Sequence, residues 1–191
     1  MESYAAFEQA VMSTAGIVKL VRQDQMTAPT PCSEWDVRAL LNHVIGTLWL
    51  GQALLGDSEP RYAMAPGGLP DTDLAGTDPA AAYSVASGAA LAAASDGDAL
   101  TRLHVTPLGE MPGPILAGFT TLDIFVHGWD LAKAIGQPVV LDDAVADHVL
   151  GFAQQALGSE EMRAGRIGLA LAVPETASVG DRLAGFLGRQ P

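Results

Sequence analysis

The chain has 191 residues, of which 49% are hydrophobic and 17% charged, and its formal net charge is -12. This length supports one sizeable core, so we expect a single domain with a small appendage, and the composition argues against extensive disorder. The negative charge and the scattering of the 10 basic residues argue against nucleic-acid and membrane-surface partners, and the apolar runs are too short to cross a bilayer.

The first residues and the cysteine content indicate a compartment and a set of available ligands. The N-terminus, Met1 to Tyr4, has no basic stretch followed by an apolar one, so we expect no secretory signal and a cytoplasmic protein. Cys32 is the only cysteine, which excludes an internal disulfide and a multi-cysteine zinc site. A metal site in this chain would therefore depend on histidine and carboxylate ligands.

The first half of the chain predicts two long helices. Hydrophobic spacing predicts an amphipathic helix over about 4–22, which is interrupted by prolines and threonines at 26–32. A second helix is predicted over about 34–55, with Ser33 as its N-cap residue and Asp36 three residues later. His43 lies on the flank of the apolar stripe of that helix. Prolines and paired glycines then predict a long loop over 56–79.

The second half of the chain predicts further helices and one extended segment. An alanine-rich helix over about 79–94 precedes a short strand or extended segment over 99–114. The fourth long helix, about 115–135, ends at Gly136 with Pro138 just beyond it. A helix over about 142–157 begins with two aspartates, which favour a helix N-terminus. In the remaining tail, 167–173 is predicted to be extended and 181–187 to form a helical turn or two.

Three side chains in the two apolar helices could bind one ion. Asp123 and His127 lie four residues apart in the fourth long helix, so they share one face. Asp130 stays on that face and could orient a ligand or contact a substrate. If the second and fourth helices are neighbours, His43 supplies a third ligand, and this set leaves a coordination position for water or substrate. The same spacing is also common in helix-surface pairs that bind no metal.

Two stretches carry a resemblance to a known family: TPCSEWDVRALLNHVIG at 30–46 and TTLDIFVHGWDLAKAIGQP at 120–138. They resemble the DinB-like superfamily, in particular the metal-binding domain of the mycothiol-dependent maleylpyruvate isomerase family. The resemblance covers about 4–157 and implies an all-α or mostly α fold, an antiparallel four-helix bundle with a short extended segment and a small C-terminal appendage. It divides the chain into a metal-binding bundle at 1–160 and a short tail packed on it at 161–191.

The resemblance also implies a site and a chemistry. It maps a divalent metal, zinc first and nickel or another ion as alternatives, onto His43, Asp123 and His127. The family pattern has Glu where this chain has Asp123, which reaches one methylene less far, so geometry and metal preference can differ. The family implies a low-molecular-weight thiol such as mycothiol as co-substrate, made into a thiolate by the metal.

Three functions are compatible with these residues. The first is a thiol-dependent transferase or isomerase acting on a small molecule, and the second is a metal-binding module without turnover. The third is a hydrolase that uses metal-bound water with Asp130 as a base. A homodimer is left open.

The remaining candidates have simpler interpretations. Cys32 is interpreted as a small apolar packing group and Trp35 as a core residue. Trp129, next to His127, is predicted to lie beside the metal or the substrate. His104 and His148, which lie outside the two motif stretches, are interpreted as structural or solvated.

Overall fold

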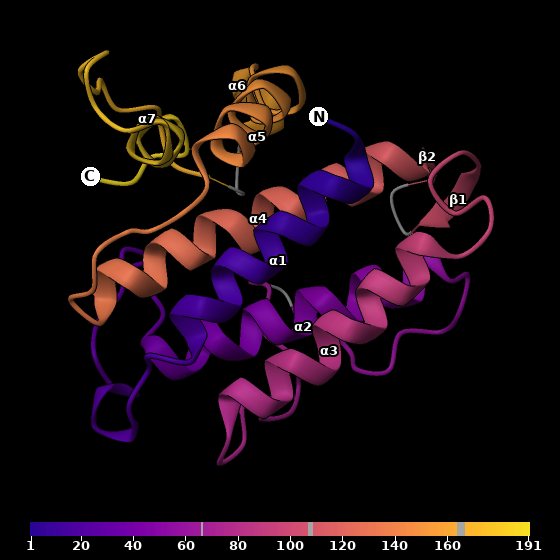
Figure 1. Cartoon of the computed structure of the whole chain (residues 1–191), viewed down its shortest axis with the longest axis horizontal. Helices are drawn as coiled ribbons and strands as arrows, with labels where there is room; N and C mark the ends of the chain where they lie inside the picture. Colours follow the sequence, from indigo (N-terminus) through magenta and orange to yellow (C-terminus); the bar gives the residue numbers. More distant parts are fainter. Residues whose placement is uncertain (66, 107–108, 164–166) are drawn as a thin grey trace.

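The computed structural model describes residues 1–65, 67–106, 109–163 and 167–191. Within these residues the chain is mostly helical, with one two-stranded sheet (Figure 1). In chain order, the elements are α1 (Ser3–Val18), the 3-10 helix η1 (Gln23–Gln25), α2 (Val37–Leu55), α3 (Pro79–Ser95), β1 (Leu103–Thr106), β2 (Gly109–Pro112), α4 (Gly113–Ala134), α5 (Asp143–Ala156), α6 (Glu160–Arg163) and α7 (Val179–Phe186).

The helices α1 to α4 form a four-helix bundle in which α1 packs on α3 and α4, and α2 packs on the same two helices. The β1–β2 hairpin lies at the end of the bundle where α2 and α3 finish and α4 begins (Figure 1). Therefore α2 and α3 run in one direction, and α1 and α4 run in the other. Because α2 and α3 are parallel, the loop at 56–78 has to return along the bundle, which accounts for its length. The predicted mostly helical four-helix bundle is confirmed.

The bundle core is formed by the inward faces of all four helices. Its largest fully buried side chains include Phe7 of α1, Leu41 and Ile45 of α2, Tyr83 of α3 and Ile124 of α4. Small residues line much of α3, so this helix lies close to α1 and α2. The hydroxyl group of Tyr83 donates to the carbonyl oxygen of Val11 at 3.0 Å, which satisfies a polar group inside the core.

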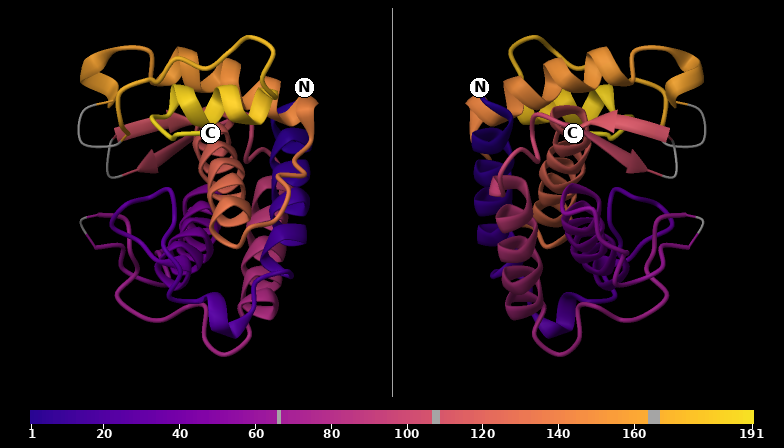
Figure 2. Two further views of the ribbon diagram at one scale, coloured as in Figure 1. Left: turned by 90° about the vertical axis from the view of Figure 1, so that its left-hand side faces the viewer. Right: turned by 90° about the vertical axis from the view of Figure 1, so that its right-hand side faces the viewer.

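A second hydrophobic cluster joins the C-terminal helices to the bundle. Helix α5 packs on α1 and α4, and α7 packs on α4 and α5, so these helices lie across one side of the bundle (Figure 2). Phe125 and Val126 of α4 contribute to this cluster together with Val149 of α5 and Leu183 of α7. This packing brings the end of the chain to the same region of α4 that carries Asp123 and His127.

The local structure before α2 differs from the prediction. The N-cap residue of α2 is Asp36, whose carboxylate accepts from the backbone N–H of Ala39 at 2.8 Å, and the helix begins later than expected. Ser33 lies instead in a turn closed by Thr30, whose hydroxyl group bonds the carbonyl oxygen of Trp35 at 2.8 Å. A local Asp-to-backbone bond at the helix start thus replaces the predicted Ser cap.

The other predicted boundaries agree with the structure to within about two residues, except that α1 ends at Val18 rather than near residue 22 and is followed by the unexpected η1. Two further differences lie in the C-terminal part of the chain. Helix α6 was not expected, and 167–173 forms no regular strand, although the N–H of Leu171 donates to the carbonyl oxygen of Gly185. The predicted extended segment at 99–114 contains the paired strands β1 and β2, and α4 already begins at Gly113; residues 107 and 108 lie outside the described residues. Residues 164–166 of the predicted tail also lie outside them.

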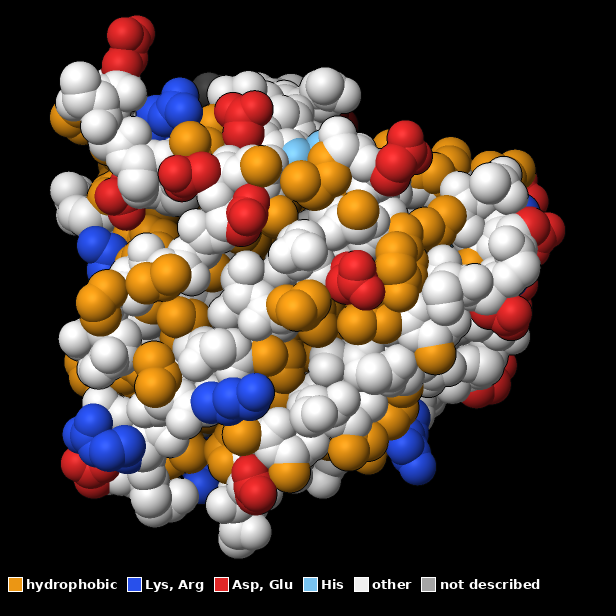
Figure 3. All heavy atoms as spheres, in the orientation of Figure 1, with side chains coloured by type: hydrophobic (Ala, Val, Ile, Leu, Met, Phe, Trp, Pro, Cys, Tyr) orange, Lys and Arg blue, Asp and Glu red, His pale blue; other side chains and the backbone are white. Residues whose placement is uncertain are grey.

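The surface and the helix lengths bear on the predicted partners. Among the described helices, none combines the length and apolar character that a bilayer crossing needs. On the face shown in Figure 3, Lys and Arg side chains are dispersed among acidic and apolar ones and form no continuous basic area.

The close packing of α1 on α4 gives a test of the bundle. A Cβ atom at Gly128 would lie 2.5 Å from Thr14 Oγ1, and that hydroxyl group is held by a 3.0 Å bond to the carbonyl oxygen of Ile124. We expect Gly128→Ala to lower the free energy of unfolding by about 1–3 kcal/mol in urea denaturation. The control Gly88→Ala, at an exposed position of α3 with no atom within 4 Å, should raise it by up to about 1 kcal/mol. Equal effects of the two substitutions would contradict the proposed tight contact.

Candidate metal centre

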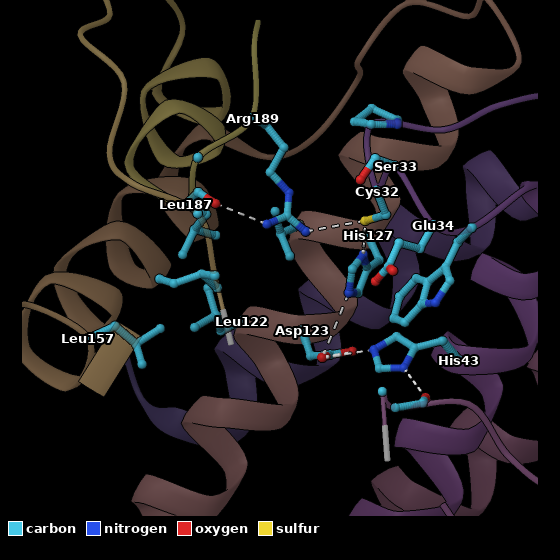
Figure 4. Close-up of a pocket in the computed structure, with 18 of the residues that line it drawn as sticks. Cys32, Ser33, Glu34, His43, Leu122, Asp123, His127, Leu157, Leu187 and Arg189 are labelled. Atoms are coloured by element: carbon cyan, nitrogen blue, oxygen red, sulfur yellow. Dashed lines mark hydrogen bonds and ion pairs between the residues drawn. The ribbon is translucent and has the colours of Figure 1, made fainter. Parts of the chain in front are cut away.

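A pocket of about 810 Å³ lies between α4, the N-terminal half of α2, the turn before α2 and the C-terminal end of the chain. Side chains from these separate segments point toward one another across it (Figure 4). Three of the predicted site residues, His43, Asp123 and His127, line the pocket. The structure therefore brings together the side chains that the sequence placed on two different helices.

His43 reaches the pocket from α2 and is held from behind by the long loop. Its Nε2 atom lies 3.1 Å from Asp123 Oδ2, and its Nδ1 atom lies 2.5 Å from the carbonyl oxygen of Gly68. Gly68 has a φ of +81°, and a Cβ atom there would lie 3.2 Å from the His43 ring. The absence of a side chain at residue 68 thus allows the backbone to approach the imidazole.

His127 faces the same carboxylate from α4 and is held from behind by Asp130. Its Nε2 atom lies 3.9 Å from Asp123 Oδ2, and its Nδ1 atom lies 2.8 Å from Asp130 Oδ2. The spacing of three residues between His127 and Asp130 puts both side chains on one face of the helix, as the sequence predicted. Asp130 is fully buried, so its carboxylate depends on its partners within the protein.

These contacts determine how each imidazole presents its nitrogens. A carbonyl oxygen and an ionised carboxylate only accept hydrogen bonds, so the Nδ1 atoms of His43 and His127 must both donate. In a neutral ring the Nε2 atom then carries a lone pair, and both lone pairs point toward the oxygens of Asp123. The lone pairs of the two Nε2 atoms and those of the Asp123 carboxylate repel one another unless a cation or additional protons lie between them. Metal-binding histidines typically donate their other ring N–H to a carboxylate or a carbonyl oxygen in this way.

Asp123 has a buried oxygen atom without a hydrogen-bond partner in the described part of the chain and a lowered pKa, as expected of a metal ligand. Its Oδ1 atom is buried and has no hydrogen-bond partner among the described residues. Burial alone would raise the pKa of Asp123, but the facing rings of His43 and His127 bring its pKa well below the usual range. Burial lowers the pKa of His43, and the Asp123 carboxylate raises it, with a net upward shift. The site therefore favours positive charge beside Asp123.

The three ligand groups fit a small divalent cation. All of their ligand atoms lie within 4.8 Å of one another. Metal–ligand distances of about 2.1 Å in a tetrahedral zinc site separate neighbouring ligand atoms by about 3.4 Å, which lies between the two observed Nε2–Oδ2 distances. The donor set, the orphaned Oδ1 atom and the orientation of both rings thus agree with a metal centre, and the identity of these ligands stays a prediction.

Two residues next to this group were not assigned to it from the sequence. Arg189, from the end of the chain, donates to Asp130 through Nε at 3.3 Å and through Nη2 at 3.1 Å. The sulfur of Cys32 lies 3.4 Å from Asp130 Oδ2 and 3.9 Å from His127 Nδ1. Burial and the Asp130 carboxylate raise the pKa of the Cys32 thiol to about 12, so this sulfur stays protonated near neutral pH. Cys32 is therefore part of a polar network rather than only an apolar packing group.

The position of Arg189 follows from how α7 ends. Gly188 has a φ of +85°, and the N–H of Arg189 returns to the carbonyl oxygen of Ala184, which forms a Schellman motif. A Cβ atom at Gly188 would lie 2.7 Å from the Cα atom of Gly168, so the two backbones meet closely. A glycine at residue 188 was the only signal in the sequence, and it indicates a helix end without indicating what the next side chain contacts.

Trp35 and Trp129 lie in the reverse of their predicted places, since Trp35 was expected in the core and Trp129 beside the metal or the substrate. Trp35 lines the pocket, with its ring 4.5 Å from that of His43 and 5.8 Å from that of His127, measured between centroids. Trp129 is fully buried, is absent from the pocket lining, and donates through Nε1 to Asp181 of α7 at 2.9 Å. Trp129 lies two residues after His127, and two helical steps of about 100° each turn its side chain to nearly the opposite face, so proximity in sequence did not give proximity at the site.

The other two histidines lie outside this pocket. His104 is buried and contacts Asp57 at 3.0 Å and the carbonyl oxygen of Ala99 at 2.7 Å, which is a structural role. His148 lies half-buried on α5.

Comparison with known proteins gives one family. The family model for the mycothiol maleylpyruvate isomerase N-terminal domain matches residues 7–132. Two uncharacterized proteins of Mycobacterium tuberculosis, from two strains, are each 34% identical over 193 residues, which span 99% of this chain and 98% of theirs. The crystal structure of the mycothiol-dependent maleylpyruvate isomerase is similar with a TM-score of 0.68 at 15% identity, covering 98% of this chain and 88% of that chain. At this identity the similarity establishes the fold.

The Asp130 network predicts a pH dependence of stability. Burial raises the pKa of Asp130, but His127 and Arg189 lower it, so that the net pKa lies below the ordinary aspartate value at which the unfolded chain titrates. The unfolded state therefore binds more protons in acid, and the stability that Asp130 contributes above about pH 5 is lost as the pH falls through the folded-state pKa. In urea denaturation of the metal-free protein, Asp130→Asn should reduce the slope of stability against pH between about pH 3 and 5.

An exposed carboxylate provides the control for this measurement. Asp147→Asn, on the outer face of α5, should keep the wild-type slope. A wild-type slope in Asp130→Asn would show that this buried carboxylate does not contribute in the manner described.

Proposed function

The chain belongs to the mycothiol maleylpyruvate isomerase N-terminal domain family, and from that premise we propose that it binds one divalent metal ion and uses it to activate a small thiol. The proposed ligands are His43 Nε2, His127 Nε2 and the Asp123 carboxylate. The observation that carries this proposal is the orientation of both rings, because each Nδ1 atom faces an acceptor and each Nε2 atom faces Asp123. Zinc is the proposed ion, since two imidazoles and one carboxylate leave it a position for an exchangeable ligand.

The proposed co-substrate is mycothiol or a thiol of similar size. The family takes its description from a mycothiol-linked isomerase, and a pocket of about 810 Å³ beside the ligands has room for a small molecule. When bound, a divalent ion stabilises the thiolate form of a coordinated thiol by the same electrostatics that acidify bound water. Because the pKa of Cys32 is raised to about 12, the reacting sulfur in this proposal belongs to the co-substrate and not to the protein.

The residues around the ion have separate tasks in this proposal. The carbonyl oxygen of Gly68 and the carboxylate of Asp130 hold the two imidazoles in the tautomer that binds a metal. Asp123 offsets part of the positive charge of the ion. The apolar side of the pocket limits the access of water to the thiolate, which keeps the sulfur a strong nucleophile.

The proposed reaction class is a thiol-dependent isomerase or transferase. A hydrolase with Asp130 as general base is less well supported. The carboxylate of Asp130 is fully buried and already accepts from His127, Cys32 and Arg189. A base that activates water needs a free oxygen directed at that water, and Asp130 acts instead as a support for His127.

Metal content tests the proposed ligands. The full chain is purified without an affinity tag and its metal content is measured, together with His43→Ala, His127→Ala and the control His148→Ala on α5. We expect about one ion per chain in the wild type and in the control, and a loss of at least about tenfold in metal affinity in both ligand variants, because each removes one of three ligands. Circular dichroism establishes that each variant is folded.

The cobalt-substituted protein then reports the thiol directly. Addition of mycothiol should produce a sulfur-to-cobalt charge-transfer absorption in the wild type and in His148→Ala. Stoichiometric metal in both ligand variants would contradict the assigned ligands, and an unchanged cobalt spectrum with thiol present would contradict thiol activation.

A further inference from the structure

The pocket has a polar end and an apolar wall, which are formed by different residues. At the polar end lie the proposed metal ligands and the Cys32–Asp130–Arg189 network. On α4, Phe119, Leu122 and Val126 follow one another at spacings of three and four residues, so they continue the face that carries Asp123. The wall is completed by side chains from the C-terminal part of the chain: Leu157, Ile167 and Leu187.

The charged groups that line the pocket leave little to attract an anion. Among the described residues in its lining, those with a carboxylate or guanidinium group are Glu34, Asp123 and Arg189. Glu34 is exposed at the edge of the pocket, and Asp123 faces the proposed ion. The proposed ion would offset the charge of Asp123, and the thiolate would take its open position. An anionic substrate would then meet the carboxylate of Glu34, in a chain whose formal net charge is -12.

Arg189 does not compensate for these carboxylates, because its guanidinium group is already engaged. Its Nε and Nη2 atoms donate to the two oxygens of Asp130, at 3.3 and 3.1 Å. Its Nη1 atom donates to the carbonyl oxygen of Leu187 at 3.1 Å, and Nη2 also contacts the sulfur of Cys32 at 3.5 Å. Because Asp130 is completely buried, removing Arg189 from it to bind a substrate would leave a buried carboxylate without its counter-charge.

We propose that the substrate that meets the thiol in this pocket is an uncharged electrophile whose apolar part lies against the Phe119, Leu122 and Val126 face of α4. This inference rests on the proposed function and adds the substrate class to it. A carboxylate on that part of the substrate would lose its hydration against an apolar wall and find no free cation among the described lining residues. An alkyl or aromatic group would instead cover the apolar surface that this face still exposes, where Phe119 is half-buried and Leu122 and Val126 are nearly buried.

The chemistry of such a substrate balances without a further reactant. The sulfur forms a bond to the β carbon of an unsaturated ketone or ester, and the electrons of the carbon–carbon double bond move to the carbonyl oxygen. The resulting enolate takes up one proton, equal to the one that the thiol released. The net change is addition of the thiol across the double bond, and reversal after rotation about the former double bond gives an isomer and returns the thiol.

A matched pair of probes tests the substrate class by binding alone. Methyl cinnamate and cinnamate share one skeleton and differ in charge. We titrate each into the zinc-loaded full chain by calorimetry with mycothiol present, so that the carboxylate does not bind at the open position of the ion. We expect the ester to bind at least about tenfold more tightly than the carboxylate. Phe119→Lys, which adds a cation at a half-buried wall position, should weaken ester binding and strengthen carboxylate binding. Val85→Lys, at an exposed position of α3, should change neither affinity.

Each outcome decides the proposal. Equal or tighter binding of cinnamate in the wild type, binding of neither probe, or an ester preference unchanged in a folded Phe119→Lys variant would overturn it. If that variant does not fold, the comparison of the two probes in the wild type still decides. Metal content and the cobalt–thiol absorption, measured on the same preparation, report on the proposed function separately, so failure of the substrate class can be told from failure of the metal or thiol.

Discussion

The arrangement of the pocket depends on two hydrogen bonds made behind the imidazoles rather than in front of them. The carbonyl oxygen of Gly68 holds Nδ1 of His43, and the carboxylate of Asp130 holds Nδ1 of His127. Both contacts fix the rings so that their remaining nitrogens face Asp123, where a cation is the natural partner. Without these two supports the same three side chains could satisfy one another as an ordinary buried ion-pair cluster.

The fold supplies each support from a different part of the chain. The return loop between the parallel helices α2 and α3 brings Gly68 over His43, so the helix order of the bundle is linked to the tautomer of one ring. Asp130 lies one turn beyond His127 on α4, and the C-terminal layer of α5 and α7 delivers Arg189 to neutralise it. The C-terminal segment therefore completes the site as well as covering the bundle.

The sequence allowed prediction of those parts of the fold and site that local spacing determines. The helices followed from hydrophobic periodicity, and the positions of Asp123, His127 and Asp130 on one face followed from helical geometry. The pairing of His43 with them required the neighbourhood of α2 and α4, for which a family resemblance was needed. Arg189 and Trp35 could not be assigned, because a Schellman turn and a capped loop place them through contacts between segments distant in sequence.

The central claim is that His43, Asp123 and His127 share one cation, and anomalous diffraction from a crystal of the zinc-loaded protein tests it most directly. Data collected on both sides of the zinc absorption edge would locate the ion without reference to the surrounding density. The account predicts one peak within about 2.3 Å of both Nε2 atoms and of an Asp123 oxygen. A peak at Cys32 and Asp130 instead, or no peak between the two rings at full zinc loading, would contradict it.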